Sequence, residues 1–140
     1  MRQKTSYAHC PPALEVERIS KHSALLTFAE NAAQVSAPDG AMAWEADAYT
    51  LIVPWQKDLC GIVESHYDEW LAHAKDKAYE RAATEIRERR DALLLSCDWT
   101  QATDSPLSED IRIGWRIYRQ ALRDVPEQPG FPWDVTWPEI

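Results

Sequence analysis

Residues 49–54 read Tyr-Thr-Leu-Ile-Val-Pro, and the apolar pattern of the chain changes directly after them. Aromatic and β-branched residues favour a strand, and Pro54 ends it because proline has no backbone N–H to donate. From Trp55 onward, apolar residues recur at intervals of three and four, the period of one helix face. They are Leu59, Ile62, Val63, His66, Trp70, Leu71, Ala74, Ala78, Ala82, Ile86, Leu93 and Leu94. We therefore predict a strand followed by one long helix from Gln56 to Leu95.

Shorter segments with strand character precede this junction. They are residues 13–19, 23–28 and 43–45. Pro38-Asp39-Gly40 predicts a turn between them, because proline presets one corner and glycine permits a positive φ. Residues 1–12 predict an irregular lead-in that ends at two consecutive prolines. Together these segments predict a small antiparallel sheet.

A second helix is predicted after a polar connector that runs from Asp98 to Pro106. Asp104 or Ser105 is placed to cap it, with Pro106 in its first turn. Its apolar stripe and its stop are set by Ile111, Trp115, Tyr118, Leu122 and the Asp124-Val125-Pro126 segment. The residues beyond Pro126 are rich in proline and contain two tryptophans, Trp133 and Trp137. This composition predicts an extended tail, either packed back on the helices or exposed to bind a partner.

These elements predict an α+β fold in three parts. Residues 1–54 form a small N-terminal antiparallel β-rich subdomain, residues 55–95 a long connecting helix, and residues 96–140 a C-terminal helical module with an extended Pro/Trp-rich tail. In the second half of the long helix, residues 75–91, alanine replaces large apolar residues and both signs of charge alternate. Two interpretations fit this pattern: a solvated rod, or a helix that bridges subdomains or packs on a partner helix.

Charge and composition exclude several classes of partner. The net charge of −8 argues against nucleic acid, because phosphate binding needs clustered Lys and Arg. No apolar run is long enough to span a membrane. Cys10, Cys60 and Cys97 lack paired spacing and the N-terminus lacks a signal-peptide pattern, so we expect free thiols in a reducing cytoplasm. Seven tryptophans in 140 residues suit a core and an interface equally well.

No constellation of residues predicts catalysis. His66 and His73 lie two helical turns apart, about 10 Å by helix rise, which is too far to share one metal ion with Glu69. Cys97 has no glycine-rich elbow and no suitably placed histidine. Only four glycines occur, which excludes a phosphate-cradling loop. We predict that the protein is not an enzyme and has no catalytic, metal-ligating or cofactor-binding residues.

Four arginines form a stripe along the second helix at intervals of four, three and four. They are Arg112, Arg116, Arg119 and Arg123. The stripe is either a docking strip for an acidic partner or an internal set of ion pairs with Asp98, Asp104 or Asp124. The abundance of aspartate in the connector favours internal pairing.

The stretch from about Arg90 to Pro138 resembles the phage tail assembly chaperone family. The resemblance lies in an Arg- and Leu-rich helix end, a D-W-T connector, D-S-P, a helix with W-x-x-Y-R-Q-x-L-R-D, and an F-P and W-P tail. The matching residues are Arg90, Leu94, Asp98, Trp99, Thr100, Asp104, Ser105, Pro106, Trp115, Tyr118, Arg119, Gln120, Leu122, Arg123, Asp124, Pro126, Pro132, Trp137 and Pro138. Over a shorter match, residues 44–51 and 66–72 are similar to tail-fibre assembly proteins of Mu-like phages.

The resemblance implies a non-enzymatic chaperone that assists a phage tail or tail-fibre protein by direct contact in the host bacterial cytoplasm. The alternative is a small structural adaptor or fibre-associated component retained in the virion tail. Neither the client nor an oligomeric state follows from the sequence. Candidate partner contacts are the motif residues Asp98, Trp99, Thr100, Asp104, Trp115, Tyr118, Arg119, Arg123, Asp124 and Trp137, together with Trp133. Trp99, Trp115, Tyr118 and Trp137 fit a core as well as a contact, whereas Trp133 is the expected exposed anchor.

Overall fold

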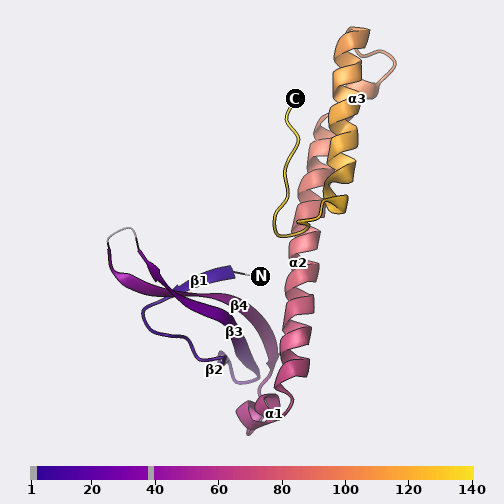
Figure 1. The fold of residues 1–140 in the computed structure, drawn as a ribbon. Helices are drawn as coiled ribbons and strands as arrows, with labels where there is room; N and C mark the ends of the chain where they lie inside the picture. The colour runs from indigo at the N-terminus through magenta and orange to yellow at the C-terminus, as the bar shows by residue number, and fades with distance from the viewer. Residues whose placement is uncertain (1–2, 38–39) are drawn as a thin grey trace. The chain divides into compact units, whose positions relative to one another are not determined.

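The computed structural model describes residues 3–37 and 40–140, which pack as two compact units. The N-terminal unit is Met1–Glu80 and the C-terminal unit is Arg81–Ile140. The first contains an antiparallel sheet with helices, and the second is helical, so the predicted α+β fold is confirmed. Figure 1 shows the elements of each unit.

The sheet of the N-terminal unit has four antiparallel strands in the order β1-β4-β3-β2. They are β1 Gln3–Tyr7, β2 Leu14–Arg18, β3 Ser23–Ser36 and β4 Met42–Pro54. The irregular lead-in predicted for residues 1–12 is wrong for residues 3–7, because β1 pairs with β4 from Gln3↔Ala48 to Tyr7↔Trp44, whereas residues 8–12 are irregular as predicted and residues 1–2 lie outside the described residues. The sequence of β1, Gln-Lys-Thr-Ser-Tyr, has almost no apolar alternation. An edge strand can form on backbone hydrogen bonds alone, so such a strand escapes detection by pattern.

The predicted strands at residues 43–45 and 49–53 belong to a single long strand, β4, and β3 extends well beyond Phe28. A bulge between Glu30 and Ala33 interrupts the β3–β4 register, and Asn31 has a φ of 53° there. Bulges insert an unpaired residue without ending the strand, which is why the apolar pattern breaks while the pairing continues.

The predicted turn Pro38-Asp39-Gly40 lies partly outside the described residues, which exclude Pro38 and Asp39. Gly40 has a φ of 82°, the positive value expected of glycine in a turn. Its backbone N–H donates to the Ala37 carbonyl at 2.8 Å.

The core of the N-terminal unit forms where one face of the sheet meets α1, Leu59–Ser65, and the first turns of α2, Tyr67–Ser96. Its buried residues are Ala24, Leu26, Phe28, Tyr49, Leu51, Leu59, Val63, Leu71, Ala74 and Ala78. Alternate residues of β3 and β4 supply the sheet side, and residues spaced by three and four supply the helix side, as the two periods require.

The predicted single helix from Gln56 to Leu95 is wrong in two respects. Regular helix begins at Leu59, and it is interrupted at His66, whose φ of −132° and ψ of 38° are not helical. The His66 N–H donates to the Val63 carbonyl three residues earlier, and the Ser65 hydroxyl donates to the Ile62 carbonyl. The apolar spacing of three and four continues through His66, so the pattern contains no sign of the break.

The C-terminal unit contains the rest of α2, a 3-10 turn η1 at Asp98–Gln101, helix α3 at Glu109–Asp124, and a second 3-10 turn η2 at Val125–Glu127. Helix α3 starts at Glu109 with Ser108 as its N-cap, so the predicted cap at Asp104 or Ser105 is wrong. Arg112 explains the difference: its guanidinium donates to the carbonyls of Ser105, at 3.0 Å, and Thr103, at 3.4 Å. These bonds hold the connector outside the helix.

The tail adopts turns before it becomes extended. Residues 128–134 form turns, and residues 135–140 have no regular structure. The backbone N–H groups of Trp133 and Asp134 both donate to the Gly130 carbonyl at 2.8 Å. A Cβ at position 130 would collide with the Asp134 carbonyl, so glycine is required there.

Candidate functional site

Arg119 is the structural centre of the C-terminal unit. Its guanidinium donates to the Asp98 carboxylate at 2.6 Å, to the Leu94 carbonyl at 2.7 Å and to Cys97 Sγ at 3.0 Å. Burial lowers the pKa of Arg119, but the hydrogen bonds to Cys97 and Asp98 outweigh it, and the net effect raises the pKa. Through these hydrogen bonds, Arg119 on α3 connects to the end of α2 and to Asp98 at the start of η1. Asp98 and Arg119 are both motif residues.

Thr100 supports the same junction from η1. It is fully buried, and its hydroxyl donates to the Cys97 carbonyl at 2.7 Å while accepting a hydrogen bond from Gln101 Nε2 at 2.8 Å. A buried hydroxyl with both roles satisfied fixes the local backbone. Thr100 therefore positions its neighbours and is closed to direct contact by a partner.

An aromatic row links η1 to α3. The ring centroids of Trp99 and Trp115 are 6.4 Å apart, and those of Trp115 and Tyr118 are 5.7 Å apart with the planes at 84°. Edge-to-face contacts of this kind add to the stabilisation that apolar burial provides. Trp115 and Tyr118 are half-buried, whereas 53% of Trp99 is exposed.

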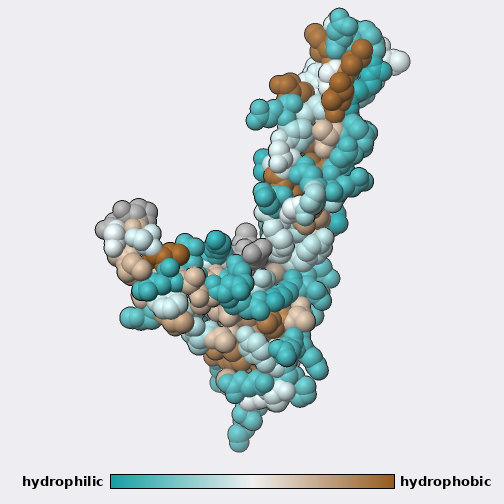
Figure 2. All heavy atoms as spheres, viewed as in Figure 1, coloured by the Kyte–Doolittle hydropathy of each residue, from teal (hydrophilic) through white to brown (hydrophobic). Residues whose placement is uncertain are grey.

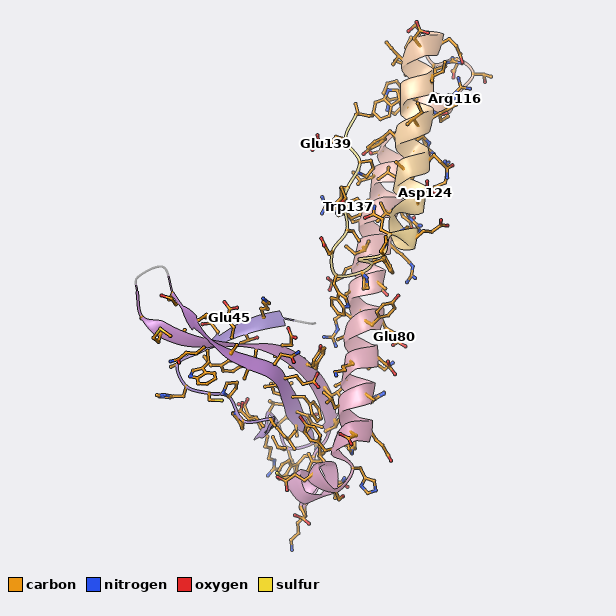
Figure 3. The ribbon with its side chains drawn as sticks, in the orientation of Figure 1. Glu45, Glu80, Arg116, Asp124, Trp137 and Glu139 are labelled. Atoms are coloured by element: carbon orange, nitrogen blue, oxygen red, sulfur yellow. The ribbon has the colours of Figure 1, made fainter. Side chains whose placement is uncertain are left out.

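The tail packs against α2 within the C-terminal unit. The Arg89 guanidinium lies 4.3 Å from the centre of the Trp137 ring, and that of Arg87 lies 5.3 Å from the centre of the Phe131 ring. Gln128 exchanges two hydrogen bonds with the Thr136 backbone, at 2.8 and 2.7 Å. Trp137 is half-buried in this arrangement, and 39% of Trp133 is exposed. Figure 3 shows Trp137 and Glu139 on the returning segment.

An open cavity of about 450 Å³ lies between α3 and the end of the tail, and we call it the apolar groove. It is lined by Ile111, Gly114, Trp115, Ile117, Tyr118, Ala121, Pro138, Glu139 and Ile140. Ile117 and Ile140 are 66% and 73% exposed, and a Cβ at Gly114 would meet no atom within 4 Å. Figure 2 shows apolar side chains on the surface of the helical end of the chain. The groove is therefore open and largely uncovered.

A second cavity, of about 480 Å³, lies beside η1 and α3, and we call it the basic groove. It is lined by Gln101, Arg116, Arg119, Gln120 and Arg123. The predicted arginine stripe is thus divided by role: Arg112 holds the connector and Arg119 pairs with Asp98, as the internal interpretation predicts for Arg119. Arg116 pairs with Glu109.

The remaining predicted contacts lie apart from this junction. Asp124 accepts a hydrogen bond from Gln120 Nε2 at 2.8 Å, and Asp104 is exposed in the connector. The apolar groove includes Ile117 and Ile140, which the predicted stripe omits. The spacing of four between Ile113 and Ile117, both exposed, is the sequence signal that could have revealed a second apolar face of α3.

Three further observations concern metal binding, the Cys97 thiol and membrane-spanning helices. Residues 3–37 and 40–140 contain no group of three or more His, Cys, Asp or Glu side chains that could hold a metal ion. Cys97 is buried beneath the Arg119 guanidinium. Among the described residues, no helix combines the length and the apolar character needed to cross a membrane.

The C-terminal unit thus carries two open grooves on a helical scaffold in which the buried Arg119 pairs with the half-exposed Asp98. Residues 83–140, which make up nearly all of the C-terminal unit, match the family model described as phage tail assembly chaperone protein. The resemblance predicted from residues 90–138 is confirmed. The family is non-enzymatic and its role is in tail assembly, so the predictions of a chaperone role and of no enzymatic activity are confirmed as well. No curated protein and no solved structure matches the chain.

Proposed function

We propose that the protein keeps an unassembled phage tail or tail-fibre protein soluble by binding an apolar segment of it in the apolar groove. The exposure of Ile117 and Ile140 beside the half-buried Trp115 and Tyr118 is the observation that carries the proposal. Contiguous exposed apolar surface disfavours solubility and typically marks a binding site. A tail subunit that later buries an apolar surface against its neighbour has the complementary chemistry. The interaction takes place in the host bacterial cytoplasm, where tail subunits are synthesised.

The motif residues divide into supports and contacts under this proposal. Asp98 and Arg119 hold η1 and α3 together, Thr100 fixes the backbone of η1, and Trp115 and Tyr118 line the apolar groove. Trp99, which is 53% exposed and contacts Trp115, and Trp133, which is 39% exposed in the turns of the tail, supply additional contacts outside the groove. Exposed tryptophans are frequent energetic anchors of protein interfaces.

The alternative of a structural adaptor retained in the virion tail would use the alanine-rich face of α2 for permanent packing on a partner helix. Ala74 and Ala78 of this face, and the neighbouring Ala83, are at most 2% exposed, and Ala82 is half-buried, so these alanines are largely buried within the chain. They are therefore not available for permanent packing on a partner helix, and the transient chaperone is the better-supported function.

The test is co-expression of the full chain with each tail tube, tape-measure and fibre protein of the same phage or prophage, followed by measurement of the soluble fraction of each. Ile117→Thr replaces part of an apolar contact with a hydroxyl, and Ile52→Thr is the matched control because Ile52 is 71% exposed in the other unit. We expect one tail protein to be solubilised by the native chain and by Ile52→Thr, and several-fold less by Ile117→Thr. Equal activity of the two variants would exclude the apolar groove as the binding site.

Trp133→Ala is tested in the same assay. We expect reduced solubilisation with an unchanged unfolding midpoint, because Trp133 is partly exposed and lies in the turns of the tail. If the variant is itself unfolded, Trp133 belongs to the core and does not anchor a partner.

A further inference from the structure

We infer that the basic groove binds an acidic peptide segment, with carboxylate side chains of the client as the groups recognised. The five described residues that line it are three arginines and two glutamines, without a carboxylate, in a chain whose net charge is −8. Concave surfaces lined by one sign of charge attract and orient oppositely charged ligands. The assignment of the acidic segment to the tail client rests on the proposed function, whereas the binding chemistry does not.

Arg123 supplies the principal donor group. It is exposed, and its guanidinium makes no ion pair or hydrogen bond with any residue that the structure describes. A guanidinium offers five N–H donors in a planar fork that matches a carboxylate. Arg123 can therefore donate hydrogen bonds to an incoming carboxylate without breaking an existing side-chain interaction among the described residues.

Arg116 supplies a second donor group, and releasing it from its present partner costs little stability. Its side chain is 54% exposed, and its partner Glu109 is 65% exposed. Exposed pairs of this kind contribute little to stability, so a client carboxylate can displace Glu109 from Arg116. Figure 3 places Arg116 on α3, away from the tail segment that carries Trp137 and Glu139.

Arg119 and the glutamines form the fixed part of the basic groove. Arg119 is held by Asp98, Leu94 and Cys97, while Gln101 and Gln120 each use one amide hydrogen bond, to Thr100 and Asp124. Each carboxamide retains a second N–H donor. A preorganised set of donors loses less entropy on binding than a mobile one.

The two grooves lie on opposite faces of α3. Tyr118 lines the apolar groove and Arg116 the basic groove, and the same division holds for Ala121 and Arg123. Residues two apart on a helix project about 200° apart. A client segment that combines apolar and acidic residues can therefore engage both sides of α3.

A carboxylate-bearing peptide fits this site better than nucleic acid does. Asp98 pairs with Arg119, Glu109 pairs with Arg116, and Asp124 accepts a hydrogen bond from Gln120, so carboxylates adjoin the basic groove. A nucleic acid presents a phosphate at every nucleotide and requires a broad basic surface, which these carboxylates interrupt. One or two carboxylates of a peptide can reach the arginines between the carboxylates of the chain.

The experiment uses the full chain and an acetylated, amidated tetraglutamate peptide, with NMR detection of the arginine Nε–Hε signals. We expect the signals of Arg116 and Arg123 to shift, with an affinity that falls as salt is added. Arg123→Gln should weaken binding about tenfold, the loss expected for a charged hydrogen bond. Arg81→Gln removes the same charge from an exposed position of α2 outside the groove and should leave the affinity unchanged. Glu109→Gln should strengthen binding because it releases Arg116.

Four results would each overturn the inference. The first two are no shift of the Arg116 and Arg123 signals, and equal effects of Arg123→Gln and Arg81→Gln. The others are tighter binding of duplex DNA than of tetraglutamate, and an equal response to a tetralysine peptide. Ile117→Thr should bind tetraglutamate as the native chain does. If that variant and the native chain both fail to solubilise any tail protein but retain peptide binding, the proposed function fails and the basic groove stands.

Discussion

Arg119 shows how one side chain organises the C-terminal unit. Its three partners, Asp98, Leu94 and Cys97, all belong to the end of α2 or the start of η1, while Arg119 itself lies on α3. Its side chain is 10% exposed, compared with 55% for that of Asp98. A buried charge needs satisfied hydrogen bonds to be tolerated, and Arg119 has them. The helical junction on which both grooves depend is therefore maintained by this residue.

Arg119→Met tests this role by keeping much of the apolar stem while removing the guanidinium. We expect the free energy of unfolding of the C-terminal unit to fall by about 2 kcal/mol, because charged hydrogen bonds are lost and Asp98 loses its partner. Arg123→Met is the control and should change it by less than about 0.5 kcal/mol, as exposed substitutions usually do. Urea titration followed by tryptophan fluorescence measures both variants. Equal changes would mean that the Arg119 network contributes little to stability.

At the scale of elements, a charged contact beside the apolar core connects α2 to the sheet within the N-terminal unit. Lys75 Nζ lies 2.6 Å from Glu30 on β3 and 5.6 Å from the centre of the Tyr49 ring on β4. The hydrogen bond to Glu30 is the main reason that the pKa of Lys75 is raised above its usual 10.5; burial opposes it. The contact therefore stabilises the charged lysine in the folded chain.

The raised pKa of Lys75 predicts how the stability that this contact contributes changes with pH. Because the folded-state pKa is raised, the stabilisation is fully present below the unfolded pKa and is lost as pH rises through the folded pKa. We expect Lys75→Met to be less stable than the native chain by about 0.5 kcal/mol at pH 7, a value typical of a partly exposed pair. The difference should shrink as pH rises above 10.5. Thermal unfolding at several pH values measures this, with Lys77→Met, whose lysine pairs with Glu80 along the helix surface, as the control. A difference that is constant with pH would show that the lysine stem, and not its charge, stabilises α2.

At the scale of the whole molecule, the chain joins a unit that matches a family to one that does not. The family match at residues 83–140 falls within the C-terminal unit, where both grooves lie. The N-terminal unit has its own buried core of β3, β4, α1 and α2 residues. Each unit thus has its own packing, and client binding is proposed for the C-terminal one.

A transient chaperone and a retained virion component differ in where the protein is found after assembly. Quantitative mass spectrometry of purified phage particles, compared with the lysate in which they formed, measures this directly. We expect the protein to be abundant in the lysate and absent from the particles, because a groove that shields a subunit is vacated when the subunit meets its neighbour. A fixed copy number per particle would instead make the protein a structural adaptor.

The sequence by itself determined the elements whose signals are local and periodic, together with the family. Residues 49–54 predicted a strand, and the spacing from Ile111 to Leu122 predicted the apolar face of α3, because side-chain period follows backbone geometry. The motif from Arg90 to Pro138 was sufficient to predict the chaperone family. The sequence identified Asp98 and Arg119 as motif residues. Internal pairing of the arginine stripe with aspartates was one of two interpretations, the other being a docking strip for an acidic partner.

Tertiary structure decided the features that depend on segments distant in sequence. The polar strand Gln3–Tyr7 exists because β4 offers it a backbone to pair with, and no side-chain pattern encodes that partner. The break at His66 and the start of α3 at Glu109 follow from hydrogen bonds that the apolar spacing does not report. The apolar groove forms only when the tail returns to α3, so Ile117 and Ile140 become neighbours of one cavity through packing alone.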